Sequence, residues 1–199
     1  MAVSIVSFVI FAFTQIITPG PANMIMLTTG ARYGFRAALP FVGGVILGKQ
    51  IIIWPLGLWL LNAAVHWPYL FFLLKYLSAC YILWLAWLVA NLRLTKNTEE
   101  GSVPGFFAGL WVHPLNPKAW AMIITGFTNF VSPEGSNIAS TGIMAACLLV
   151  IQMICHPIWT FFGDRIAQFV SETPYEKYLM WSLSVITIVV LGNVLFFGV

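Results

Sequence analysis

Long apolar segments are the feature that most restricts the fold of this chain. A helix needs roughly 20 apolar residues to cross the hydrocarbon core of a bilayer. Six segments approach or exceed that length: residues 3–27, 37–61, 69–91, 105–130, 138–163 and 178–197. Only 8% of the residues are charged against 60% hydrophobic, which leaves too little polar surface for a soluble globule. The sequence therefore predicts an all-α integral membrane protein with six transmembrane helices.

The connections between these segments are short, so residues 1–199 are predicted to form a single transmembrane domain. The longest connection, residues 93–103, gathers charged residues, Ser and Gly as a solvated loop does. It divides the chain into halves of residues 1–92 and 104–199. The first charged residue is Arg32, so the opening segment lacks the basic region of a signal peptide and is predicted to remain as the first helix.

Basic residues in short loops set the orientation of membrane helices. They follow the first, third and fifth apolar segments: Arg32, Arg36, Arg93, Lys96, Arg165 and Lys177. This distribution predicts that both termini lie outside the cell. The formal net charge of +3 comes from scattered residues, which does not favour nucleic acid as a partner.

Two proline motifs interrupt the apolar segments. "TPGPANM" (residues 18–24) lies in the first segment and "HPLNPK" (residues 113–118) in the fourth. Pro21 and Pro117 are 96 positions apart, about half the chain. Because each half holds three helices, the second half must begin on the opposite membrane face. The pattern predicts two inverted three-helix repeats, an arrangement used by many transporters, with proline-broken first and fourth helices.

Proline cannot donate to the carbonyl four residues earlier. The carbonyls released in this way are those of Gln15, Ile17, Leu110 and His113. Irregular backbone at membrane depth is tolerated only when it is packed in protein or lines a polar cavity. Gly20 with Pro21, and Asn116 with Pro117, fit a helix cap followed by proline. The N-terminal ends of such half-helices favour binding of an anion. The alternative to a binding site is that each proline only kinks its helix.

Two lysines fall within predicted membrane helices, where charged residues are functional candidates. Lys118 follows the second break and needs an anion or an escape to water, by extending to the interface. Lys49 lies near the middle of the second segment. Residues 1–98 contain no Asp or Glu. We therefore expect an anionic group on the substrate to bind these lysines.

His113 and His156 each precede a proline and are predicted to share one depth in the membrane. Asp164 lies at the predicted inner end of the fifth helix. A proton relay among these three residues is one hypothesis, because histidine titrates near neutrality; ordinary hydrogen-bonded helix histidines are the alternative. No metal site or cofactor is predicted, since Cys155 and His156 are adjacent and have no second ligand pair at helical spacing.

The sequence holds no Ser-centred elbow, phosphate loop, paired carboxylates or HExxH motif, so we do not predict an enzyme. Gly44 with Gly48, and Gly105 with Gly109, have the small-residue spacing of close helix contacts. This spacing also permits a homodimer.

The stretches "TPGPANMIML", "ARYGFRAALPFVGGVILG", "CYILWLAW" and "NPKAWAMIITGF" together resemble the LysE/RhtB family of bacterial amino-acid exporters, on the side of the cysteine and O-acetylserine exporters. The resemblance covers essentially the whole chain. It implies a multi-pass carrier of the bacterial inner membrane, embedded in the lipid bilayer, that exports small amino acids. Lys49 departs from it, since an uncharged residue is expected there. The resemblance implies a substrate path at Thr18, Pro19, Gly20, Pro21, Asn23, Asn116, Pro117 and Lys118.

The leading hypothesis is therefore a secondary exporter of small, neutral amino acids or derivatives such as cysteine or O-acetylserine. The substrate carboxylate would bind near Lys118, and its ammonium near the released carbonyls and Asn23 or Asn116. Export of an organic anion or a metal ion is one alternative. A membrane enzyme or assembly factor without a transport path is another.

Overall fold

The computed structural model describes residues 3–60, 102–131, 137–170 and 173–197, together with the isolated positions 76, 80, 83, 87 and 90. Helices make up most of the described residues, and the only β pairing among them is an isolated antiparallel bridge between Val3 and Val131. The prediction of an all-α protein is confirmed for this part of the chain. The predicted third helix (69–91), apart from isolated positions, and most of the linker (93–103) lie outside the described residues.

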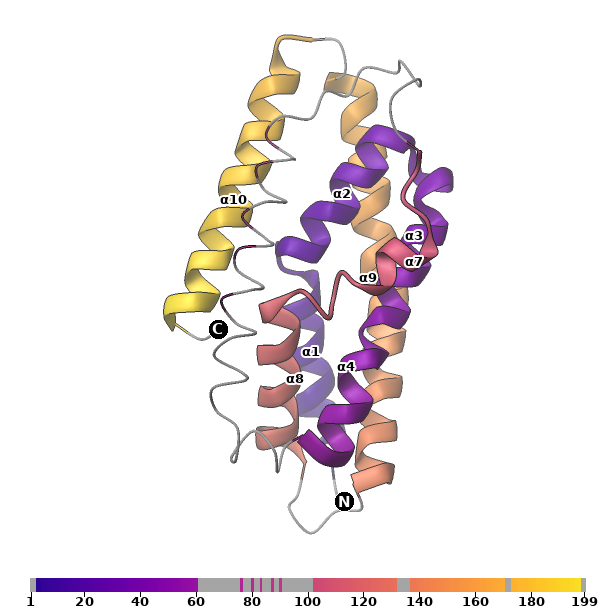
Figure 1. The fold of residues 1–199 in the computed structure, drawn as a ribbon, viewed down its shortest axis with the longest axis vertical. Helices are drawn as coiled ribbons and strands as arrows, with labels where there is room; N and C mark the ends of the chain where they lie inside the picture. The colour runs from indigo at the N-terminus through magenta and orange to yellow at the C-terminus, as the bar shows by residue number, and fades with distance from the viewer. Residues whose placement is uncertain are drawn as a thin grey trace.

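The first half of the chain contains a bent helix pair followed by an interrupted helix (Figure 1). The elements are α1 (Ile5–Ile17), α2 (Pro21–Tyr33), α3 (Phe35–Gly48), α4 (Gln50–Pro55) and a π-helical turn, η1 (Leu56–Leu60). Helices α1 and α2 meet at an angle of 50° across the proline motif. The break predicted in the first helix is therefore present.

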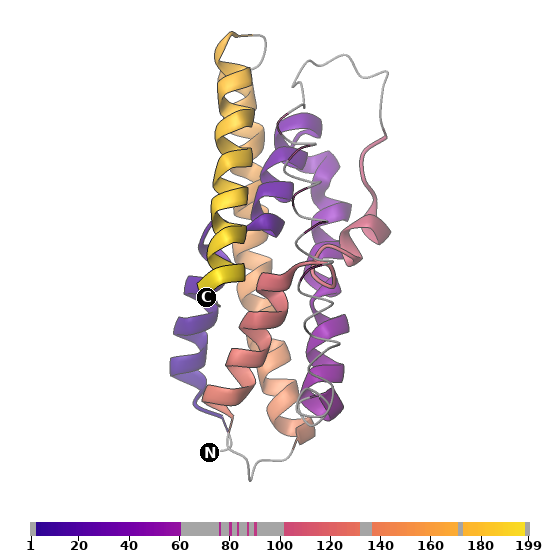
Figure 2. The same cartoon turned by 60° about the vertical axis from the view of Figure 1, so that its left-hand side comes forward.

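The second half of the chain also begins with a broken helix. The elements are α7 (Phe106–Leu110), α8 (Pro117–Phe130), α9 (Asn137–Val170) and α10 (Tyr175–Phe197). A tight turn at residues 111–115 separates α7 from α8. Figure 2 shows the end of α9 and the start of α10 at the upper end of the molecule.

Among the described residues, Phe35–Leu58 and Ile138–Val170 are long and apolar enough to cross a membrane. The bent helix pair α1–α2 is a third candidate span when its two helices are taken together. Helix α9 ends at Val170 rather than at the predicted residue 163. Its charged end stays helical because hydrogen bonds along the helix surface join Asp164 to Gln168 and Arg165 to Gln168.

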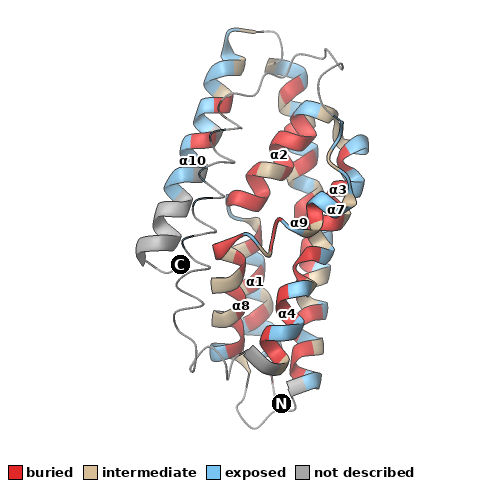
Figure 3. Ribbon diagram, viewed as in Figure 1, coloured by how far each residue is buried: buried red, intermediate tan, exposed pale blue. Residues whose placement is uncertain are grey.

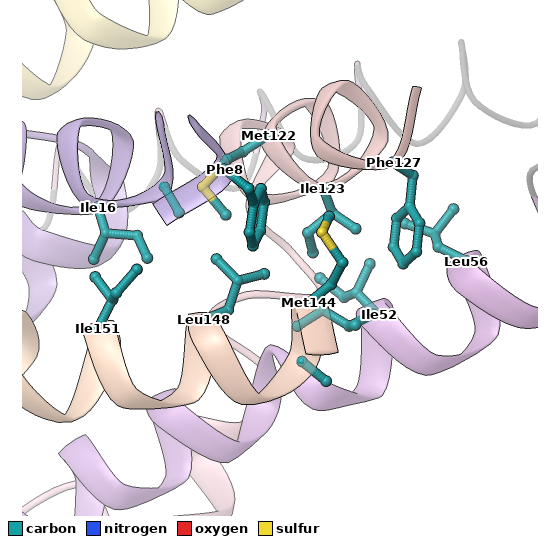
Figure 4. Packing of buried hydrophobic residues seen from close by; sticks show 14 of the residues in the cluster. Phe8, Ile16, Ile52, Leu56, Met122, Ile123, Phe127, Met144, Leu148 and Ile151 are labelled. Atoms are coloured by element: carbon teal, nitrogen blue, oxygen red, sulfur yellow. The ribbon is translucent and has the colours of Figure 1, made fainter. Parts of the chain in front are cut away.

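Apolar side chains fill the space among α1, α4, α8 and α9. Phe8, Ile52, Ile123, Met144 and Leu148 are almost fully buried there (Figure 4). The outer surface is also apolar, because Phe107, Ile138 and Phe169 are each at least 70% exposed; Figure 3 shows the exposed residues of α10 along one side. A chain with apolar residues both inside and outside is suited to a lipid environment.

Glycines allow two helix pairs to pack backbone against backbone. At the α2–α9 contact, a Cβ on Gly30 would overlap the Thr160 carbonyl, and one on Gly163 would overlap that of Leu27. At the α3–α7 contact, Gly44 and Gly109 are equally close to backbone atoms of the facing helix. A Cβ added to Gly105 would have no atom within 4 Å. The close helix contact predicted for Gly105 is therefore wrong, because this residue precedes α7 and lies outside the interface.

Candidate functional site

The two proline breaks lie side by side at the middle of the molecule (Figure 1). The backbone N–H of Ser4 donates to the Phe130 carbonyl at 2.9 Å, so the start of α1 lies beside the end of α8 and the two helices run antiparallel. Helix α2 then leads away from its break in one direction and α8 from its own in the other. The positive N-terminal ends of both half-helices therefore face one region.

Each half-helix starts with the predicted cap and proline. Gly20 is the extended N-cap residue of α2, followed by Pro21. Asn116 caps α8 through its Oδ1 atom, which accepts from the Lys118 backbone N–H at 3.0 Å. The capping predictions are confirmed.

Lys118 joins the two breaks. Its Nζ atom donates to the Thr18 hydroxyl at 2.9 Å, although the two residues are 100 positions apart in the sequence. A Cβ added to Gly20 would lie 3.3 Å from the Lys118 Cδ atom, so the glycine leaves room for the lysine stem. The pairing of the two motifs that the sequence suggested is thus a direct contact.

Asn23 holds the first break from within. Its buried side-chain amide donates to the carbonyls of Ile16 at 2.7 Å and Thr18 at 2.8 Å. The Thr18 hydroxyl donates to the Gln15 carbonyl at 3.1 Å. Protein donors thus cover carbonyls exposed by the break, and the amide nitrogen of Asn23 donates to two of them.

We expect Asn23→Leu to destabilise the protein by about 2 kcal/mol or more, because two carbonyls at the break lose their donor. Asn129→Leu is the matched control, since Asn129 is exposed and its side-chain amide donates only to Thr125 and Thr128 of its own helix. The thermal unfolding midpoint in detergent measures both variants. Equal midpoints for the two variants would contradict the structural role of Asn23.

The second break is closed by its own turn and by neighbouring side chains. The Asn116 N–H donates to the His113 carbonyl at 2.9 Å, and the Trp120 indole N–H donates to that of Pro114 at 2.9 Å. The Leu110 carbonyl lies against Gly48 of α3. Three of the four released carbonyls that were expected to meet the substrate ammonium, those of Gln15, Leu110 and His113, are therefore already in contact with protein groups.

A cavity of about 30 Å³ lies between the two breaks. The predicted site residues that line it are Thr18, Gly20, Asn23, Lys49, His113, Asn116, Lys118 and His156. Three predicted prolines, Pro19, Pro21 and Pro117, shape the breaks without lining the cavity. None of the described residues that line it is acidic.

A buried cluster of three polar side chains lies beside this cavity. The Nε2 atoms of His113 and His156 are 3.3 Å apart, and the Gln152 amide nitrogen is 3.0 Å from each. All three residues are at most 3% exposed. The shared depth predicted for the histidines is confirmed. If both rings are neutral with the hydrogen on Nδ1, the Gln152 amide donates to both Nε2 atoms. An added proton would then bind one Nε2 atom and face the other.

Gln152 was not predicted from the sequence as a site residue. It lies four positions before His156 on α9, and residues at that spacing share one helix face. An amide within an apolar segment, one turn from a buried histidine, was the available signal.

Asp164 does not join the histidines. It lines a separate cavity with Tyr33, Arg36 and Arg165, between the α2–α3 turn and the later part of α9. About 12 Å of helix rise separates it from His156. The predicted three-residue relay is not assembled in this structure, because the chain from His156 to Asp164 is helical and holds the carboxylate at the other cavity. No group of three or more His, Cys, Asp or Glu suited to a metal occurs among the described residues.

A protein-family model described as LysE type translocator matches residues 13–198, nearly the whole chain. The chain belongs to the LysE family. This confirms the family that the sequence motifs indicated.

Two similar relatives carry the name cysteine/O-acetylserine efflux protein. The one from Salmonella typhimurium is 28% identical over 128 residues, which cover 64% of this chain and 66% of the relative. The aligned region thus spans just under two thirds of the Salmonella relative. The one from Escherichia coli is 25% identical over 157 residues, 79% of this chain and 80% of the relative. No solved structure has a significant match to the chain.

Proposed function

We propose that this protein is an inner-membrane secondary exporter of small amino acids or amino-acid derivatives, with cysteine and O-acetylserine as the first compounds to test. The observation that carries the proposal is the contact of Lys118 with Thr18, which joins two broken helices across a cavity lined by both polar and apolar residues at the middle of the molecule. Membership of the LysE family and the efflux proteins among the relatives support it.

In this proposal the substrate carboxylate binds to Lys118 and to the facing N-terminal ends of α2 and α8. Lys118 supplies a charge-assisted hydrogen bond and the half-helices supply positive partial charge. The ammonium group then lies away from Lys118, toward the side chain of Gln15, which lines the same cavity. The cavity of about 30 Å³ has room for about two water molecules, so the halves must separate to admit an amino acid.

We also infer that the whole chain forms six transmembrane helices in two inverted repeats, residues 1–92 and 104–199, with both termini outside. The matched caps of α2 and α8 and their opposite directions from the breaks support this arrangement. Inverted repeats commonly place discontinuous helices at the substrate site of secondary transporters.

Export of an organic anion is the second candidate function. It is favoured by the presence of both Lys49 and Lys118 in one cavity with no acidic residue among its described lining. The same two cations make a metal-ion substrate unfavourable, because they repel a cation.

The test is counterflow of labelled compounds in liposomes that contain the purified protein. We expect at least one small amino acid to exchange across the membrane above the rate of empty liposomes. Exchange of carboxylic acids that lack an amino group, without exchange of any amino acid, would support the second candidate. Exchange of neither class would contradict a transport function.

We further propose that the pair His113 and His156, held by Gln152, carries the proton if export is coupled to a pH gradient. We expect His156→Gln to remove the effect of an imposed pH gradient on liposome flux, because one ring can no longer share the proton. Asp164→Asn is the matched control, and its flux should keep the wild-type response. Loss of the response in the Asp164 variant alone would contradict this assignment.

A further inference from the structure

Lys49 is a buried lysine with no acidic side chain near it in the described part of the chain. It lies between α3 and α4, is 2% exposed and lines the cavity between the breaks. Gly48 packs against the Leu110 backbone, which holds this point of the chain beside the second break. Removing a charge from water without a partner is costly. A partner from outside the protein would offset that cost.

The chain has few groups that could neutralise Lys49. Its six acidic residues all follow residue 98, and of those only Asp164 and Glu176 are described. Asp164 lines the other cavity, and Glu176 lies in the first turn of α10. The polar residues around Lys49 in the cavity include His113 and His156, which are not anions.

The charge balance of the cavity therefore differs from that of a neutral amino acid. Two lysines line it, while a neutral amino acid offers one carboxylate together with an ammonium group. The proposed function assigns the α-carboxylate to Lys118. A second anionic group on the substrate would pair with Lys49 and leave neither lysine alone.

We propose that Lys49 makes this cavity select amino acids whose short side chain ends in an anionic group, such as a carboxylate, sulfinate or thiolate. This rests on the proposed function and names its substrate class. The side chain must be short because Lys49 and Lys118 line the same small cavity. Cysteine fits as the thiolate, whereas O-acetylserine has no anionic side chain.

Aspartate and asparagine provide the test, since they have nearly the same shape and differ in charge. We expect liposomes with the wild-type protein to exchange aspartate at least about tenfold faster than asparagine, the ratio that roughly 1.4 kcal/mol of charge pairing produces. Lys49→Gln should bring this ratio to one or below it. Lys177→Gln removes an exposed lysine at the start of α10 and should leave the ratio unchanged.

Equal exchange of aspartate and asparagine by the wild-type protein would overturn the inference, even if Lys49→Gln failed to fold. An unchanged ratio in folded Lys49→Gln would overturn it as well. In both cases exchange of amino acids would leave the proposed function standing. Absence of exchange for every amino acid would instead overturn the proposed function together with this inference.

Discussion

Replacing Lys118 by Met is expected to lower amino-acid exchange by about a hundredfold, because a charge-assisted hydrogen bond to the carboxylate is lost together with the electrostatic attraction. The Lys118 Nζ atom donates to the Thr18 hydroxyl at 2.9 Å. Lys118 also lines the cavity at the start of α8. No other described side chain spans both breaks in this way. Counterflow of labelled substrate in liposomes measures the loss.

The fold should survive this change. Met has nearly the length of Lys and removes a half-buried charge that has no acidic partner among the described residues of the cavity, which lowers the cost of burial, so the thermal midpoint of Lys118→Met should match or exceed that of the wild type. Thr18→Val removes the hydroxyl but keeps the cation, and we expect a much smaller loss of exchange. Wild-type exchange by a well-folded Lys118→Met protein would show that the carboxylate binds elsewhere.

The sequence was sufficient to predict the breaks and their relation to each other. Gly20 before Pro21, and Asn116 before Pro117, form the expected caps, because capping depends on residues close together in the chain. The contact of Lys118 with Thr18 was not derivable in detail, since it joins positions 100 residues apart. The sequence indicated only that the two motifs were related.

Other site features depend on neighbours that periodicity does not reveal. Asn23 was expected beside the substrate; it lines the cavity, and its amide nitrogen also donates to carbonyls of the break because α1 and α2 bend around it. Gln152 is a site residue because α9 places it against His113, which is 39 positions away in the sequence. A relay that included Asp164 was one hypothesis, but the helix between His156 and Asp164 separates them by about 12 Å of rise.

The close packing of α2 on α9 leads to the prediction with the largest effect on folding. Gly163→Val is expected to destabilise the protein by about 3 kcal/mol, the upper part of the usual range for overpacking, because its Cβ would overlap the Leu27 carbonyl. Gly30→Val should cost a similar amount, since its Cβ would overlap the Thr160 carbonyl. The thermal midpoint in detergent and the fraction of monodisperse protein measure both changes.

Gly142→Val is the matched control on the same helix. A Cβ at Gly142 meets only the end of the Trp54 side chain, at 3.9 Å, which is ordinary van der Waals distance. Its thermal midpoint should stay close to that of the wild type, because valine finds space there without moving a backbone. If Gly163→Val were as stable as Gly142→Val, the α2–α9 interface would have to open by enough to admit a side chain. That outcome would make this helix pair a part of the protein that can move during transport, instead of the fixed support that the backbone contacts at Gly30 and Gly163 indicate.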